Sequence, residues 1–260
     1  MITADHEEDA MDELELLLEL HRDGERQGPG GDDETRLAIT LSGLAARQRL
    51  AVADIGCGTG ASTLVLAREL DASITAVDFL PPFLARLEAR AGEAGLGNRI
   101  ETLAASMDAL PFEPASLDAI WSEGAIYNLG FARGIEAWRP FLKPGGVLAV
   151  SELTWLTQAR PAELEQHWAG EYAEVATASA KIAQLEAAGY SLLGYFPLPE
   201  RCWLENYYRP LQARFAAFLA QFDHAEAAEA IVAAEEAEIA LYERYQAFVS
   251  YGFYVARRVN

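Results

Sequence analysis

The chain has 260 residues, of which 51% are hydrophobic, so it can bury a large core and fits one elaborated domain better than two complete ones. Its 40 acidic and 20 basic residues give a formal net charge of −20 at pH 7, a surface field that repels phosphate backbones and anionic membranes. We therefore expect neither a nucleic-acid nor a membrane partner.

The cysteine content and the lack of long apolar segments exclude further classes of protein. The only cysteines, Cys57 and Cys202, are far apart in the sequence, which offers neither a disulfide framework nor metal-ligand spacing. The chain shows no leader-like N-terminus, and no apolar run reaches the roughly 18 residues of a membrane span. These patterns predict a cytoplasmic protein without a metal site.

The first 49 residues predict a helical cap. Residues 5–22 place leucines at helical spacing, with acids in the first turns and His21 and Arg22 at the end, which suits the helix dipole. The stretch GERQGPGGDDE at 24–34 contains glycines and a proline that break regular structure, and a helical pattern resumes after it. This pattern predicts a loop between two helices.

From residue 50 to 152, strand and helix patterns alternate. The expected strands are LAVADI (50–55), ASITAVD (72–78), IETLAAS (100–106), LDAIWSE (117–123) and GVLAVSE (146–152). Such apolar runs are typical of parallel strands buried on both faces. The alternation predicts a doubly wound, mostly parallel α/β sheet with ligands at the carboxyl ends of its strands.

After Glu152 the alternation is interrupted by two expected helical insertions, 153–177 and 202–247, before a last strand at 248–258. The insertions are rich in aromatic residues, which could build an apolar pocket for a small organic ligand. The whole chain, 1–260, is expected to form a single domain.

The sequence VADIGCGTG at 52–60 places glycines at alternate positions after a predicted strand: Gly56, Gly58 and Gly60. Such a loop lets the backbone approach a nucleoside closely, and its amides and the following helix provide donors. Together with Ala61 it also satisfies the GxGxxG/A pattern of dinucleotide enzymes. The glycines alone do not separate the two kinds of ligand.

Two acids flank this loop in the predicted sheet. Asp54 precedes the first glycine, where a carboxylate would repel a diphosphate and attract a cationic ligand such as S-adenosylmethionine, although it could instead only cap the turn. Asp78 ends the second strand, where an acid can accept hydrogen bonds from ribose hydroxyls of either cofactor, or cap the next helix.

These motifs, together with AVDF (76–79), SMDALPF (106–112) and LKPGG (142–146), resemble the class I S-adenosylmethionine-dependent methyltransferases over roughly residues 35–152. ERQGPGG, IWSEGAIYNLGF and GGVLAVSELTW further resemble a group of uncharacterised bacterial methyltransferases similar to the ubiquinone/menaquinone enzymes. The resemblance implies a Rossmann-like methyltransferase sheet with an antiparallel last strand, S-adenosylmethionine as cofactor and S-adenosylhomocysteine as product.

The resemblance also assigns cofactor contacts. It places the three glycines around the methionyl and ribose portions, Asp54 near the amino end and Asp78 on the ribose hydroxyls. An N-terminal segment that closes over the cofactor would bring Arg26 to the methionyl carboxylate.

At the adenine, the resemblance implies that Phe79 lies against the ring. Asp108 would accept a hydrogen bond from the adenine amino group, with Ser106 and Met107 lining that edge. Glu123, at the end of the fourth strand, would face the methyl group.

Methyl transfer is an in-line displacement at carbon, for which the protein mainly aligns the reactants and excludes water. A general base is added when the nucleophile must lose a proton. The candidates are Glu123, Tyr127 and His167, each with an alternative structural role.

The leading hypothesis is therefore methyl transfer to a small organic acceptor. The rivals are an NAD-dependent oxidoreductase, which Asp54 and the SMD segment argue against, and a cofactor-binding protein without catalysis. The acidic N-terminal helix and the Ala/Glu-rich block could be lids or the surfaces of a homodimer.

Overall fold

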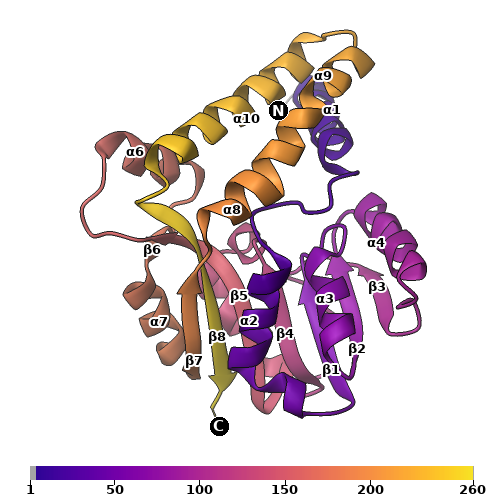
Figure 1. Ribbon diagram of the computed structural model, residues 1–260, viewed down its shortest axis with the longest axis vertical. Coiled ribbons are helices and arrows are strands. Elements are labelled where there is room, and N and C mark those ends of the chain that lie inside the picture. Colours follow the sequence, from indigo (N-terminus) through magenta and orange to yellow (C-terminus); the bar gives the residue numbers. More distant parts are fainter. Residues whose placement is uncertain (1–3, 260) are drawn as a thin grey trace.

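Eight strands form one sheet in the structure, a computed structural model that describes residues 4–259 (Figure 1). The strands are β1 (Leu50–Ile55), β2 (Ala72–Asp78), β3 (Ile100–Ala104), β4 (Leu117–Glu123), β5 (Leu142–Trp155), β6 (Ala176–Thr177), β7 (Tyr190–Pro197) and β8 (Val249–Arg258). Their order is β3-β2-β1-β4-β5-β8-β7, with β6 paired to the end of β5. Only β8 runs antiparallel to its neighbours, as the described residues show, which confirms the predicted fold class.

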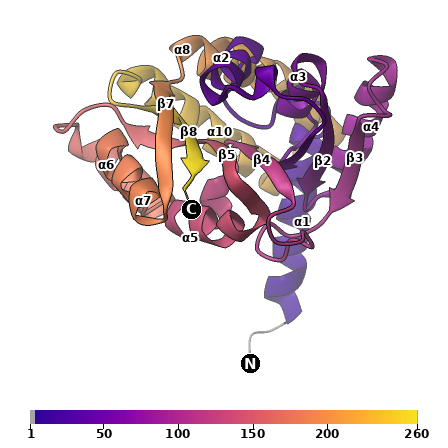
Figure 2. The same ribbon diagram turned by 90° about the horizontal axis from the view of Figure 1, so that it is seen from below.

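Helices cover both faces of this sheet (Figure 2). One face carries α2 (Asp32–Ser42), α3 (Ala61–Glu69) and α4 (Pro81–Glu93), and the other carries α5 (Phe131–Trp138) and α7 (Ala178–Ala187). Alternate strand residues point to opposite faces, so Val52 and Trp121 belong to the core cluster under α2 and α3, whereas Ile55 and Ile120 pack toward α5. The central strands β1, β4 and β5 are therefore buried along most of their length.

The parallel strands end at a common edge. Asp54 is paired in register with Ala76 of β2 and Trp121 of β4. The residues that follow these positions, the glycine loop, Asp78 and Glu123, therefore leave the sheet side by side. This register brings together residues that are far apart in the sequence.

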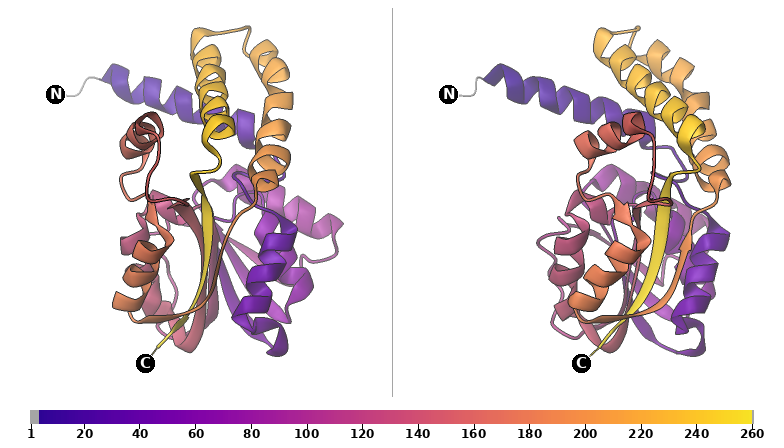
Figure 3. Two further views of the ribbon diagram at one scale, coloured as in Figure 1. Left: turned by 60° about the vertical axis from the view of Figure 1, so that its left-hand side comes forward. Right: turned by 90° about the vertical axis from the view of Figure 1, so that its left-hand side faces the viewer.

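A helical layer lies over this carboxyl edge (Figures 1 and 3). It consists of α1 (Ala4–His21), α6 (Ala162–Glu171), α8 (Glu200–Trp203), the π-helical turn η4 (Leu204–Tyr208), α9 (Arg209–Gln221) and α10 (Glu226–Tyr245). The predicted helical block 202–247 folds back on itself because the chain turns at Asp223 and His224, both with positive φ. Trp203 stacks on Tyr242 at 4.4 Å between ring centroids and joins the start of this block to its end.

The strand boundaries depart from the predicted ones. In the expected helical insertion 153–177, β5 continues to Trp155 and β6 forms at Ala176–Thr177, so only α6 (Ala162–Glu171) is helical there. β3 ends at Ala104, earlier than predicted, which leaves Ala105 and Ser106 in a loop at the carboxyl edge. β5 begins at Leu142 and takes in the LKPGG motif through a register irregularity opposite Leu117 and Ala119. No helix of residues 4–259 is long and apolar enough to cross a membrane.

Candidate functional site

A cavity of about 900 Å³ lies between the carboxyl edge of the sheet and the helical layer. The predicted site residues that line it are Arg26, Gly56, Gly58, Asp78, Phe79, Ser106, Met107, Asp108, Glu123 and Tyr127. Asp54, Gly60 and His167 do not line it. The tertiary structure thus gathers most of the predicted set into one place.

The glycine loop has no side chains at Gly56 and Gly60 for two reasons, its backbone conformation and the close approach of neighbouring residues. Gly56 and Gly60 have φ values of 72° and 85°, a left-handed conformation that favours glycine. A Cβ on Gly60 would lie 2.1 Å from Leu87 Cδ1, and one on Gly56 would lie 2.3 Å from Ala125 Cβ. The glycines therefore serve close packing within the protein, and not only the approach of a ligand that the sequence suggested.

Most of the loop's amides are already used inside the protein. The amides of Gly56 and Cys57 donate to the Val77 carbonyl at 2.8 and 3.0 Å, and the Gly58 amide donates to Asp78 Oδ2 at 2.8 Å. A pyrophosphate held by such a loop needs these donors free. The loop is consequently a poor cradle for a diphosphate.

Asp54 lies buried beneath this loop, at the start of α3. Its Oδ2 accepts hydrogen bonds from Ser62 Oγ at 2.8 Å and Thr63 Oγ1 at 2.6 Å, while Oδ1 has no partner among the described residues. Burial raises the pKa of Asp54 to about 7. Asp54 thus fixes the first turn of α3, and one of its oxygens stays unsatisfied.

Asp78 joins the loop to the next helix from inside the cavity. Besides the Gly58 amide, it accepts the Leu80 amide on Oδ1 at 2.9 Å, and burial raises its pKa. Each carboxylate oxygen keeps a second lone pair for a ligand hydroxyl. Next to it, the ring of Phe79 lines the cavity although the residue is 68% exposed, an unusual position for a large apolar side chain.

Asp108 is held in its ionised form at the same end of the cavity. Ser106 Oγ donates to Asp108 Oδ1 at 2.6 Å, and this bond lowers the pKa of Asp108. The neighbouring Met107 carbonyl accepts from Trp138 Nε1 at 2.9 Å, which fixes the loop. Asp108 is therefore a hydrogen-bond acceptor directed at whatever occupies this end.

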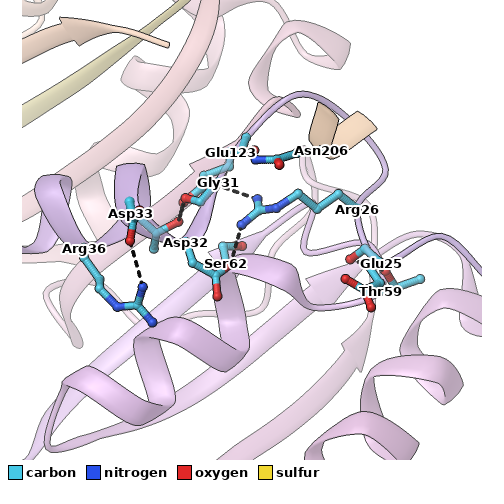
Figure 4. A network of polar contacts seen from close by, with 12 residues as sticks. Glu25, Arg26, Gly31, Asp32, Asp33, Arg36, Thr59, Ser62, Glu123 and Asn206 are labelled. Atoms are coloured by element: carbon cyan, nitrogen blue, oxygen red, sulfur yellow. Dashed lines mark hydrogen bonds and ion pairs between the residues drawn. The ribbon is translucent and has the colours of Figure 1, made fainter. Parts of the chain in front are cut away.

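Residues 22–31, here called the 22–31 loop, connect α1 to α2 across the glycine loop (Figure 4). Thr59 Oγ1 donates to the Gly24 carbonyl at 2.8 Å, and Asn206 Nδ2 of η4 donates to the Gly30 carbonyl at 2.7 Å. Arg90 Nη1 contacts the carbonyls of both Glu25 and Thr59, at 2.9 and 2.7 Å. The loop is thus tied to the sheet and to the helical layer.

Arg26 and Glu123 close the network beneath this loop. Arg26 Nη2 lies 2.9 Å from Asp32 Oδ1, and its Nη1 lies 3.5 Å from Glu123 Oε2. Glu123 Oε1 accepts hydrogen bonds from Thr35 Oγ1 at 2.6 Å and Trp121 Nε1 at 2.9 Å. Both oxygens of Glu123 are committed to the protein, which suits an anchor better than a general base.

Part of the chain is similar to a known family. The model of a family described as "Methyltransferase domain" matches residues 52–146, the segment that carries the glycine loop, Asp78, Asp108 and Glu123. The match covers less than half of the chain and includes these predicted cofactor-binding residues.

Two curated relatives share this region. The chain is 30% identical over 140 residues to 27-O-demethylrifamycin SV methyltransferase of Amycolatopsis mediterranei, a match that covers 50% of the chain and 48% of the relative. It is 39% identical over 101 residues to trans-aconitate 2-methyltransferase of Streptomyces avermitilis, covering 38% and 37%. The chain thus spans less than half the length of these relatives.

A solved structure agrees over nearly the full length. The crystal structure of a SAM-dependent methyltransferase from Geobacter sulfurreducens, in complex with S-adenosyl-L-homocysteine, superposes with a TM-score of 0.79, covering 93% of this chain and 97% of that one. At 18% sequence identity the agreement concerns the fold, and it includes segments outside residues 52–146.

The helical layer completes the cavity above residues 52–146. Tyr127 faces Tyr172 in an edge-to-face contact with ring centroids 6.0 Å apart, and both line the cavity. His167, predicted as a base, does not line it, because α6 turns Trp168, Glu171 and Tyr172 toward the cavity instead. His167 instead packs edge-to-face against Trp168.

Sequence reasoning missed several lining residues. Three leucines of α1 line the cavity, and so does His21 at the end of that helix. Three acids of α6 and α10 also line it: Glu171, Glu235 and Glu238. The acids occur in Ala/Glu-rich helices, where a charge usually faces solvent, so no local signal marked them. The positions of the aromatic residues in the insertions were the only sequence hint of this part of the site.

Proposed function

We propose that this protein transfers a methyl group from S-adenosylmethionine to a small-molecule acceptor by in-line displacement. The observation that carries the proposal is the convergence of Asp78, Phe79 and Asp108 at one end of a cavity whose floor is residues 52–146, the segment similar to the methyltransferase family. Structural neighbours with the same fold are described as complexes with S-adenosyl-L-homocysteine, which supports the same cofactor here.

The residues fit this cofactor chemically. Asp78 would accept from the ribose hydroxyls, Phe79 would cover the adenine ring, and Asp108 would accept from the adenine amino group. Asp54 does not line the cavity, and its part in this fit is indirect: it holds the first turn of α3 beneath the loop through Ser62 and Thr63. Arg26 offers a cation to the methionyl carboxylate in addition to its pairs with Glu123 and Asp32.

When bound, S-adenosylmethionine supplies an activated methyl group on a sulfonium centre. The protein's part is to hold the cofactor and the acceptor in line and to exclude water. The 22–31 loop covers the cofactor end, and the helical layer covers the acceptor end. Tyr127 is the one predicted base candidate that lines the cavity with its side chain uncommitted to an ion pair.

The alternatives have less support. An NAD-dependent oxidoreductase would need amides that Val77 and Asp78 already occupy. A binding protein without catalysis would retain affinity for S-adenosylhomocysteine and turn over no acceptor. The resemblance to the ubiquinone/menaquinone-like group, the cytoplasmic location, the homodimer and the absence of a nucleic-acid partner are parts of this proposal that rest on the sequence.

Calorimetric titration with S-adenosylmethionine tests the proposal. We expect micromolar or tighter binding to the wild type, at least tenfold weaker binding to Asp78→Ala, and unchanged binding to the control Glu93→Ala, an exposed position at the end of α4. Binding of NADH and not of S-adenosylmethionine would overturn the methyltransferase proposal.

A further inference from the structure

The part of the cavity beneath the helical layer, here called the acceptor chamber, has an aromatic wall. Tyr127 and Tyr172 form one side. Trp203 and Tyr251, with ring centroids 5.0 Å apart, form another, and Tyr207 continues it. Aromatic faces carry negative potential and attract cations.

Carboxylates from two helices open into the same chamber. Glu171 of α6 and Glu235 and Glu238 of α10 all line the cavity. Glu238 Oε1 accepts a hydrogen bond from Tyr208 at 2.8 Å, and Glu235 Oε1 lies 3.4 Å from His21 Nε2. Neither Glu235 nor Glu238 meets a lysine or arginine among the described residues.

The lysine and arginine side chains near the chamber form ion pairs with acids other than its three carboxylates. The described residues that line the cavity include three basic side chains, His21, Arg26 and Arg133. Arg133 Nη2 lies 3.8 Å from Asp108 Oδ2 at the cofactor end. Of the three, His21 is the one that lies beside the carboxylates of the chamber, 3.4 Å from Glu235. Lys181 lies behind the wall, 5.5 Å from the Tyr172 ring, and pairs with Glu152 Oε1 at 3.1 Å. Arg26 pairs with Glu123. The chamber therefore keeps a net negative charge even when His21 is protonated.

Two tyrosine hydroxyls in the chamber also lack partners. No hydrogen bond of the described residues involves the hydroxyls of Tyr207 and Tyr251, and both residues line the cavity. Burial raises the pKa of both hydroxyls, so they remain protonated. Each can accept a hydrogen bond from an ammonium group that enters the chamber.

We propose that the acceptor is an amine that enters the chamber as a cation, with its ammonium group among Glu235, Glu238 and the tyrosines and its apolar body against Leu14, Leu17 and Trp168. Before transfer, Glu235 or Glu238 takes one proton from the ammonium group, which leaves a neutral amine with a free lone pair. The nitrogen–methyl bond then forms as the sulfur–methyl bond breaks, and S-adenosylhomocysteine is the leaving group. This inference rests on the proposed function, because it names the substrate class of the same site. Cation–π contact and carboxylates that have no lysine or arginine partner favour a cation over a neutral molecule of the same shape and repel an anion.

Three probes of similar shape and different charge test the chamber: 2-phenylethylammonium, 2-phenylethanol and phenylacetate. They are titrated calorimetrically into the protein saturated with S-adenosylhomocysteine. We expect the ammonium to bind at least tenfold more tightly than the alcohol and phenylacetate to bind most weakly. Equal or tighter binding of the alcohol or the acid, or no binding of any probe, would overturn the inference.

Two variants test whether the ammonium group binds at the carboxylates of α10. Glu235→Gln and Glu238→Gln should each weaken ammonium binding at least fivefold and leave S-adenosylhomocysteine binding unchanged, because they lie outside the cofactor end. Glu236→Gln, at an exposed position on the same helix, should change neither. Ammonium binding that survives both chamber substitutions would contradict the assignment.

These experiments distinguish a failure of the proposed function from a failure of the proposed acceptor class. If S-adenosylhomocysteine does not bind, the proposed function fails, and the same probes titrated into the ligand-free protein still decide the charge preference of the chamber. If S-adenosylhomocysteine binds and the ammonium shows no preference, only the acceptor class is wrong.

Discussion

Arg26 and Glu123 meet at 3.5 Å between Nη1 and Oε2, and this contact joins the 22–31 loop to the end of β4. Both side chains are largely buried, so the attraction is weakly screened by solvent. The pair links the loop that covers the cofactor end to the strand that faces the acceptor chamber.

Loss of Arg26 should loosen the loop and remove a cation from the cofactor end. We expect Arg26→Ala to weaken S-adenosylhomocysteine binding by about tenfold, the scale of a charge-assisted hydrogen bond. Calorimetry measures this. Arg36→Ala removes an arginine whose pairs with Asp33 and Glu69 are exposed, and it should leave affinity unchanged. Equal affinity of Arg26→Ala and the wild type would show that the loop closes without this residue.

Glu123 should act as an anchor and not as a general base. Glu123→Gln keeps an oxygen for Thr35 and Trp121 and loses the charge opposite Arg26. Once a turned-over acceptor is found, we expect kcat to fall less than tenfold, with the larger change in cofactor affinity. A general base would lose on the order of 10² or more in kcat, and a fall of that size would restore Glu123 to the catalytic role.

A side chain at Gly60 should lower the free energy of unfolding through backbone strain and through a clash with Leu87, and a second glycine allows the two contributions to be measured separately. Gly60→Ala introduces left-handed strain and a clash with Leu87, whereas at Gly145, with φ 75°, a Cβ would have nothing within 4 Å. We expect Gly145→Ala to cost about 1 kcal/mol of unfolding free energy and Gly60→Ala at least about 2 kcal/mol more, from overpacking. Urea unfolding compares the two, and equal losses would mean that Leu87 yields freely.

Stability should depend on pH through Asp54. Its folded pKa of about 7 lies above its ordinary value of 3.8, so between these values the folded state binds a proton that the unfolded chain does not. The free energy of unfolding should therefore rise as pH falls from about 7 toward 4, with a slope from this group of up to about 1.4 kcal/mol per pH unit.

The matched variant for this effect is Asp54→Asn, which cannot titrate. Unfolding is measured for both proteins across that pH range, and the difference between them isolates Asp54 from other acids. A difference independent of pH would mean that Asp54 titrates near its ordinary value in the folded protein.

The sequence determined the sheet and one end of the site. Apolar runs bounded by turn residues defined β1, β2 and β4 to the residue, because strands buried on both faces leave a continuous hydrophobic signal. The glycine loop follows β1, Asp78 ends β2, and Asp108 lies in the loop after β3. Because these strands are parallel, the common edge of the three could be predicted from topology alone.

Only the tertiary structure decided the contacts of the other candidate residues and the lining of the acceptor chamber. The commitment of Glu123 to Arg26, Thr35 and Trp121, the position of Asp54 beneath the loop, and the orientation of His167 away from the cavity depend on packing between segments distant in sequence. The carboxylates of the acceptor chamber lie on helices whose pattern is that of a solvated surface. Their position depends on which face of α10 packs inward, where Tyr242 stacks on Trp203, and a local sequence motif does not specify such a contact between distant segments.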